Sequence, residues 1–121
     1  MDTPVGGTAS LLIDNEPVTL KGKLMAALYD REKEEIVGMD GSVNFTEKPV
    51  APMIKATLLF TKDTNIDKIQ RALDVDVQID LNNGSQGVLR GAVVKNRIEH
   101  DAESGEFEVE WFGEEGEWIK Q

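Results

Sequence analysis

Acidic side chains at alternate positions are the residues of this sequence that most resemble a catalytic group. Glycoside hydrolysis uses two carboxyl groups, one of which the protein keeps protonated. The acids in question are Asp76 with Asp80, and Glu106 with Glu108 and Glu110. Apolar residues stand between them, and alternate residues of a β-strand point to opposite faces. We therefore expect solvated acidic strand faces here, and hydrolysis is the weakest functional interpretation.

The remaining groups that could bind a metal or attack a substrate are sparse. His100 is the only histidine and stands between two acids in a polar stretch, which is typical of an exposed loop. The chain contains no cysteine, which excludes disulfides, thiolate nucleophiles and thiolate metal sites. There is no glycine-rich phosphate loop, and Asp80 to Gly84 lacks the closing glutamate of a calcium loop. We expect a non-enzymatic protein with no cofactor, no metal and no small-molecule substrate.

Length and charge narrow the class of partner. The chain has 121 residues, the size of one domain spanning 1–121. Its 13 basic residues are outnumbered by 23 acidic ones, which gives a net charge of −10. Proteins that hold nucleic acids or anionic membranes neutralise phosphates with lysine and arginine, so we expect neither as a binding partner. No segment resembles a secretion signal or the ~20 apolar residues of a membrane span.

The acidic side chains are expected to lie on strands whose opposite face is apolar. Val75 to Leu81 alternates apolar and polar residues, and so does Glu106 to Trp111. Asn82-Asn83-Gly84 predicts a tight hairpin turn, and Gly91 predicts a bulge in the returning strand. Further strands are expected at residues 9–13, 18–29, 54–61 and 86–98, with a turn at 14–17.

One short helix is expected at about residues 65–73. Thr64 or Asp63 would cap its first turn, because their side-chain oxygens accept hydrogen bonds from free backbone amides. The apolar stripe of this helix is expected to consist of Ile66, Ile69 and Leu73. Helix and hairpins together predict a mainly β (α+β) fold, an antiparallel β-sandwich or small β-barrel with one short α-helix.

Two segments lack a strand pattern, and we expect a flexible N-terminal arm at residues 1–8 and a long loop at 30–52. The arm is rich in glycine, threonine and proline. The loop begins with a run of charged residues, contains an Asp40-Gly41 turn signal and ends with Pro49 and Pro52. Loops of this length in a compact domain are usually functional or disordered.

The order of several segments along the chain is informative. A first strand pair through Leu20 is followed by Gly38-Met39-Asp40-Gly41 ahead of a proline-containing loop, and then by a strand at Ile54–Phe60. The expected helix, the strand ending in Asn82-Asn83-Gly84 and the segment Phe107-Glu108-Val109-Glu110-Trp111-Phe112-Gly113 come after these. Over nearly its whole length the chain thereby resembles the tail tube proteins of Mu-like contractile-tailed bacteriophages and phage-derived elements. That family has no active-site motif to carry over.

The resemblance implies a structural subunit that forms hexameric rings, which stack into a hollow tube. It implies a tail sheath and a baseplate as partners, and it places the subunit in the bacterial cytoplasm during assembly and then in the virion tail. DNA would pass through the tube as non-adhering cargo, because an anionic bore repels phosphates. The candidates for lining the bore are Asp76 and Asp80, or Glu106, Glu108 and Glu110.

Assembly would also give the two irregular segments a role. We expect residues 1–8 and 30–52 to become ordered against neighbouring subunits. The candidate inter-subunit contacts are Arg31, Lys33, Ile36, Met39 and Phe45.

Two alternatives stay open on the sequence alone. One is a monomeric β-barrel module that binds a small ligand or a protein, which would require a concave apolar pocket with a few polar groups. The other is a related tube, such as that of a bacteriocin or a secretion system, whose subunit would have nearly the same sequence pattern.

Overall fold

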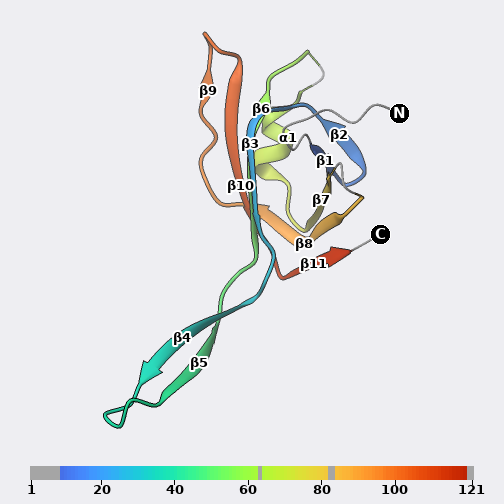
Figure 1. The fold of residues 1–121 in the computed structure, drawn as a ribbon. Helices are drawn as coiled ribbons and strands as arrows, with labels where there is room; N and C mark the ends of the chain where they lie inside the picture. Colours follow the sequence, from blue (N-terminus) through green and yellow to red (C-terminus); the bar gives the residue numbers. More distant parts are fainter. Residues whose placement is uncertain (1–8, 63, 82–83, 120–121) are drawn as a thin grey trace.

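A narrow two-stranded hairpin projects from a body of antiparallel strands (Figure 1). In this computed structural model the described residues are 9–62, 64–81 and 84–119, and they form eleven strands and one short helix. The expectation of a mainly β fold with one short helix is confirmed. Within the described ranges, no helix has the length and apolar character to cross a bilayer.

The strands of the body follow one another in the order β2-β1-β7-β8-β10-β6-β3, with β11 beside β8 and β9 beside β10. We call the first half-sheet β2 (Glu16–Val18), β1 (Ala9–Ile13), β7 (Val75–Leu81), β8 (Gln86–Val94) and β11 (Glu115–Ile119). The second half-sheet consists of β10 (Glu106–Phe112), β9 (His100–Asp101), β6 (Met53–Leu59) and β3 (Leu20–Ala27). The outermost strands of this path, β2 and β3, do not pair with each other among the described residues, so the barrel is open on one side.

One hydrophobic core lies between the two half-sheets. Alternate residues of β7 and β10 are buried, as the period of two in the sequence predicted. The largest contributions come from Leu11, Val77, Ile79 and Leu89 of the first half-sheet and from Ile54, Leu58, Val109 and Trp111 of the second. Burial of each such side chain stabilises the fold by roughly 1.5–3 kcal/mol. No polar side chain is buried in the part of the chain that the structure describes.

The first hairpin turns more tightly than the sequence indicated. Asp14 and Asn15 both have positive φ angles, 49° and 68°, which is the geometry of a two-residue turn that matches the twist of its strands. β2 therefore starts at Glu16, and the single strand expected at 18–29 is divided between β2 and β3. The Asp14 carboxylate also accepts a hydrogen bond of 2.9 Å from the backbone amide of Asp76, which ties the turn to β7.

β8 contains the bulge that Gly91 predicted. Its register against β7 shifts between the pairs made by Val75 and Val77, and Gly91 has a φ angle of 65°. The strand ends at Val94, earlier than expected, because the side chain of Asn96 pairs with β10 in place of its backbone.

The helix is shorter than expected and has a different cap. α1 spans Ile66–Arg71, and the Asn65 side chain accepts a hydrogen bond of 3.0 Å from the Lys68 amide. Thr64, one of the two expected caps, instead accepts a hydrogen bond from the loop before it, so that expectation is wrong. The other expected cap, Asp63, lies outside the described residues.

The apolar stripe of α1 is also shorter than expected. Ile66 and Ile69 pack against the core, but Leu73 is 77% exposed. The chain leaves the helix at Ala72, whose ψ angle is 136°, and Asp74 then adopts a φ angle of 60°. Leu73 therefore no longer continues the helical stripe.

The expectation of a long loop at residues 30–52 is wrong for most of its length. β4 (Arg31–Val37) and β5 (Val43–Pro49) pair antiparallel from end to end. Every residue of both strands is exposed, so neither face has to carry an apolar residue at every second position. The alternation that identifies a half-buried strand is therefore missing. The expected arm at 1–8, and Asn82-Asn83 of the expected turn, lie outside the described residues.

Candidate assembly surfaces

The β4–β5 hairpin is ordered at both ends by backbone hydrogen bonds. At its base the Val50 amide donates to the Asp30 carbonyl at 2.9 Å, and at its tip the Gly38 amide donates to the Ser42 carbonyl at 2.8 Å. The Asp40 carboxylate accepts from the hydroxyl and the amide of Ser42 at 2.6 and 3.0 Å. These bonds, the hydroxyl bond first, lower the pKa of Asp40 and keep a negative charge in the turn.

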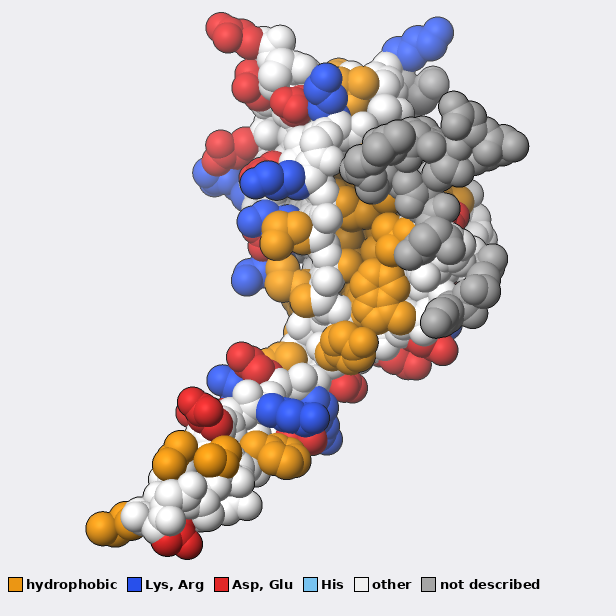
Figure 2. Space-filling model, in the orientation of Figure 1, with side chains coloured by type: hydrophobic (Ala, Val, Ile, Leu, Met, Phe, Trp, Pro, Cys, Tyr) orange, Lys and Arg blue, Asp and Glu red, His pale blue; other side chains and the backbone are white. Residues whose placement is uncertain are grey.

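The two faces of the hairpin differ in chemistry. Register pairs Val37 with Val43 and Glu35 with Phe45, so these four side chains lie on one face. We call it the apolar face for its three apolar side chains near the tip, although charged residues lie on it nearer the base. Figure 2 shows apolar side chains gathered at the far end of the hairpin. The opposite face carries an ion pair between Glu32 and Lys48 at 3.9 Å, whose side chains are both 60% exposed. Such a pair contributes about 0–1 kcal/mol, so the hairpin has no strong stabilising contact of its own.

The candidate inter-subunit residues all lie on this hairpin, but not on one face. Arg31, Lys33 and Phe45 lie on the apolar face, where the Lys33 ammonium stands 5.4 Å from the centre of the Phe45 ring. Ile36 lies on the opposite face, and Met39 is fully exposed in the turn. Sequence reasoning missed Val37 and Val43, for which the only signal was two valines on either side of a turn in a charged stretch.

The two sets of candidate bore acids lie on two separate surfaces. Asp76 and Asp80 point outward from β7 in the first half-sheet, because Val77 and Ile79 between them are buried. The other set points outward from β10 in the second half-sheet, and β8 separates the two strands. One flat surface cannot present both sets.

Among the described residues, the outer face of the first half-sheet is acidic, with Arg90 as the one cation paired to its acids. Arg90 of β8 contacts Glu117 at 3.0 Å and Glu115 at 3.6 Å, both on β11. The hydrogen bond from Arg90 to Glu117 raises the pKa of that guanidinium, to which Asp76 also contributes. The two strands that flank β8 each carry two acids, Asp76 and Asp80 on β7 and Glu115 and Glu117 on β11. These four acids outnumber Arg90, so this face has an excess of negative charge.

The outer face of the second half-sheet carries charges of both signs. Lys55 of β6 stands 3.6 Å from Glu110 of β10, and exposed Lys21 and Lys23 lie in a bulge of β3. Neither lysine of β3 has an ion-pair partner among the described residues. The three glutamates of β10 therefore lie on a face that also carries lysines of β6 and of the next strand, β3.

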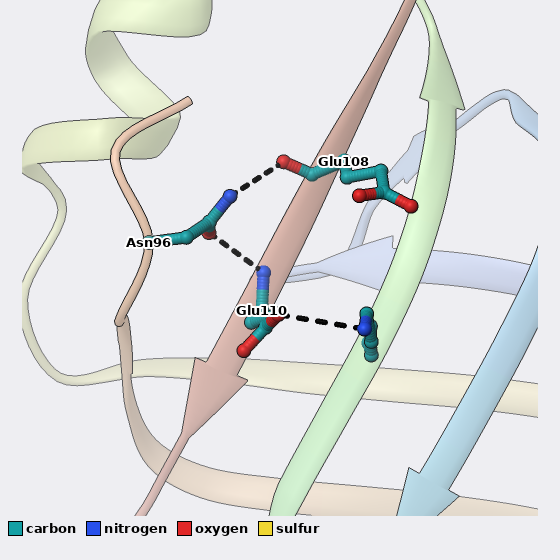
Figure 3. A network of polar contacts seen from close by, with 4 residues as sticks. Asn96, Glu108 and Glu110 are labelled. Carbon is teal, nitrogen blue, oxygen red and sulfur yellow. Dashed lines mark hydrogen bonds and ion pairs between the residues drawn. The ribbon is translucent and has the colours of Figure 1, made fainter. Parts of the chain in front are cut away.

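A side-chain amide completes the middle of β10 (Figure 3). Asn96 donates to the Glu108 carbonyl and accepts from the Glu110 amide, both at 2.9 Å, as a paired strand would do. Gln70 of α1 holds this segment in place, because it donates to the Asn96 carbonyl at 3.0 Å and accepts from the Ile98 amide at 2.7 Å. The helix, the 95–98 segment and β10 are thus joined by two amide side chains.

A groove of about 460 Å³ opens at the ends of β3 and β6 that are remote from the hairpin. Its apolar lining includes Ile13, Val18, Leu58, Ile69 and Phe107. At its polar rim Lys68 of α1 stands 3.6 Å from Glu16 of β2. Sequence reasoning could not find this groove, because its lining comes from five separate segments.

His100 packs its ring against an aromatic side chain. Its ring lies 4.5 Å from the Phe60 ring, centroid to centroid. Backbone hydrogen bonds from Glu103 and Ser104 lower the pKa of the neighbouring Asp101. Within residues 9–62, 64–81 and 84–119, no group of three or more histidine or acidic side chains is placed to hold a metal ion.

The chain matches a family model described as phage tail tube protein over residues 2–118. No curated protein matches it. Three solved structures share its fold with a TM-score of 0.68 each. The first is the PVC sheath/tube terminator of an extracellular contractile injection system, in its extended state, at 13% identity, covering 98% of this chain and 97% of that one.

The second is the tube-terminating cap of the anti-feeding prophage, at 14% identity, covering 100% of this chain and 94% of that one. The third is the PVC sheath–tube complex of an extracellular contractile injection system, in its extended state, at 12% identity, covering 99% of this chain and 93% of that one. At these identities the three structures establish the fold and no more.

Replacing Asn96 tests whether its amide stabilises β10. Asn96→Ala removes both hydrogen bonds and should lower the free energy of unfolding by roughly 1–2 kcal/mol, measured by urea denaturation. Asn96→Asp keeps the acceptor for the Glu110 amide but not the donor to the Glu108 carbonyl, so it should also destabilise. The matched control is Asn44→Ala on the exposed hairpin, which should change the value by no more than about 0.5 kcal/mol. Equal effects of Asn96→Ala and Asn44→Ala would contradict this role.

Proposed function

Because the chain belongs to the phage tail tube protein family, we propose that its copies form hexameric rings that stack into a hollow conduit for DNA. Membership of the family makes the chain a structural protein of a tail tube and not an enzyme. The proposal adds the ring number, the stacking and the cargo. It also adds a sheath around the tube, a baseplate that nucleates it, assembly in the bacterial cytoplasm and a final place in the virion tail.

The observation that carries the proposal is the exposed hairpin. An isolated two-stranded hairpin is marginally stable at best in water. Here both strands are exposed along their whole length, and Val37, Val43 and Phe45 are 60–67% exposed. Contact with neighbouring subunits would bury this apolar face and fix the hairpin in place. That supports Arg31, Lys33 and Phe45, which lie on this face, as inter-subunit contacts. We propose Ile36 on the opposite face and Met39 in the turn as further contacts, because both are exposed as well.

The likeness to solved structures supports the same assembly. All three are parts of contractile injection systems or of the anti-feeding prophage, and their descriptions name a tube with a terminator, a cap or a sheath. Each matches over more than nine tenths of both chains. We therefore propose that copies of this chain form a tube and that a sheath surrounds this tube.

For the bore we choose the outer face of the first half-sheet. Duplex DNA carries one negative charge per about 1.7 Å of its axis, so a conduit that does not bind it should present acids without nearby cations. Asp76 and Asp80 meet this condition better than Glu106, Glu108 and Glu110. In the second set Glu110 pairs with Lys55 of β6, and Lys21 and Lys23 lie one strand further on, in β3. A face with charges of both signs suits contact with another protein.

A monomeric binding module is the second candidate, and the groove between α1 and the β1–β2 turn is the observation that favours it. The groove has the volume of a small-molecule site and a lining that mixes apolar and polar side chains. This candidate leaves the exposed apolar face of the hairpin without a function, so we rank it second.

Removing the hairpin tests the assembly. Because the Asp30 carbonyl and the Val50 amide already bond at the base, residues 31–49 can be replaced by Asn-Gly as a tight turn. The shortened protein should keep the melting temperature of the wild type and fail to polymerise. Negative-stain electron microscopy of concentrated protein, with a baseplate nucleator added, should show hollow tubes of uniform width for the wild type only. The matched control is Thr46→Ser, which keeps the hairpin and should form tubes.

Two outcomes would contradict the proposal. If the shortened protein forms tubes like the wild type, the hairpin is not an essential contact. If the wild type forms no rings or tubes under any of these conditions, the chain is not a self-assembling tube subunit.

Charge reversal tests which face lines the bore. Tubes of Asp76→Lys/Asp80→Lys assembled with duplex DNA should retain it in a nuclease-resistant form, because the bore would then attract phosphates. Retention should fall as salt is raised. The matched control, Glu106→Lys/Glu108→Lys, should give no nuclease-resistant DNA. Protection by the control variant alone would place the other face in the bore.

A further inference from the structure

Both legs of the hairpin lie against one corner of the chain. The outgoing leg, residues 28–30, follows β3, and the returning leg, residues 50–52, precedes β6. The corner, residues 113–116, joins β10 to β11, and Figure 1 shows β11 beginning beside the point where the legs leave the body. Leu28 and Pro52 are buried, and no residue between them along the chain is. The corner therefore lies at the boundary between the body and the projecting hairpin.

The corner contacts each leg through backbone atoms. The Gly113 amide donates a hydrogen bond of 3.0 Å to the Pro52 carbonyl of the returning leg. Gly116 lies against the backbone of the outgoing leg. A Cβ placed on Gly116 would be 3.0 Å from the Leu28 Cα and would overlap the Leu28 carbonyl oxygen. Two backbones can approach this closely because glycine has no Cβ.

Space, and not backbone conformation, requires glycine at position 116. Gly116 is not among the glycines with a positive φ angle, and it pairs with Leu89 of β8 as an ordinary strand residue. A side chain here would have to displace Leu28 or lift β11 off β8. β11 is held to β8 at five register positions, and the Glu114 amide donates to the Arg90 carbonyl at 2.9 Å. We therefore expect the leg to move and β11 to stay.

We propose that the corner at residues 113–116 is a clasp that sets the direction in which the hairpin leaves the body. The clasp acts in the free chain, before any contact with another copy. Regular stacking requires every copy to present its hairpin in the same direction, and this consequence rests on the proposed function. Gly113 and Gly116 are thus positioning residues for the hairpin.

Spin labels on the free monomer test the clasp, because the chain has no cysteine of its own. Labels are placed at Asp30→Cys, just beyond the clasp, and at Glu108→Cys on β10, both exposed positions. The distance between the two labels should have a narrow distribution. Adding Gly116→Ala should shift or broaden it, because the new methyl group displaces Leu28. The control, Val109→Ala, leaves a cavity in the core and should lower the melting temperature without changing the label distance.

Three results would overturn the clasp. A broad distribution before any further substitution would show that the legs are not held. The same narrow distribution with Gly116→Ala would show that β11 yields in place of the leg. An equal change with Val109→Ala would show that loss of stability alone moves the hairpin.

Hydrogen exchange tests the contact with the returning leg without any substitution, so it remains decisive if Gly116→Ala does not fold. The Gly113 amide should be protected in the wild-type monomer, because it donates to the Pro52 carbonyl. Exchange as fast as in an unstructured peptide would overturn the clasp. Absence of tubes from the wild type would instead contradict the proposed function, and it would leave the label distances in the monomer unchanged.

Discussion

A two-stranded sheet without a core is the physical constraint on which the account depends. Antiparallel pairing satisfies the backbone of β4 and β5 toward each other, but it leaves their side chains and outer edges in water. Such an element gains little from burial, and ordering its residues costs about 1–2 kcal/mol each in backbone entropy. A rigid contact with another molecule offsets that cost. The ordered hairpin is therefore expected to be more stable in an assembly than in a free monomer.

The body provides the rigid support that such an arm requires. β3 and β6 run from the base of the hairpin through the core, where Ile54, Ala56 and Leu58 are buried. Asn96 and Gln70 fasten α1 to β10 and so fix one wall of the groove.

The sequence predicted the elements that have one dry face and missed those that have none. β7 and β10 alternate strictly because the core lies on one side of them, and the bulge at Gly91 was visible because glycine adopts its φ angle freely. Sequence patterns favour a loop at the hairpin, because solvent surrounds both of its faces. The sequence does not decide the helix cap, because Thr64 and Asn65 are both good caps and only the observed hydrogen bonds distinguish them. The acids were recognised as outward-facing, but their separation onto two half-sheets follows from long-range pairing that local patterns do not contain.

Hydrogen exchange of the backbone amides is the most direct test of the central claim that the hairpin is held by its neighbours. In dilute monomer the amides of β4 and β5 should exchange rapidly, while those of β7 and β10 stay protected by the core. In assembled tubes the amides of β4 and β5 should become protected as well. Strong protection of β4 and β5 in the monomer, equal to that of β7, would show that the hairpin is stable alone. That result would contradict the account.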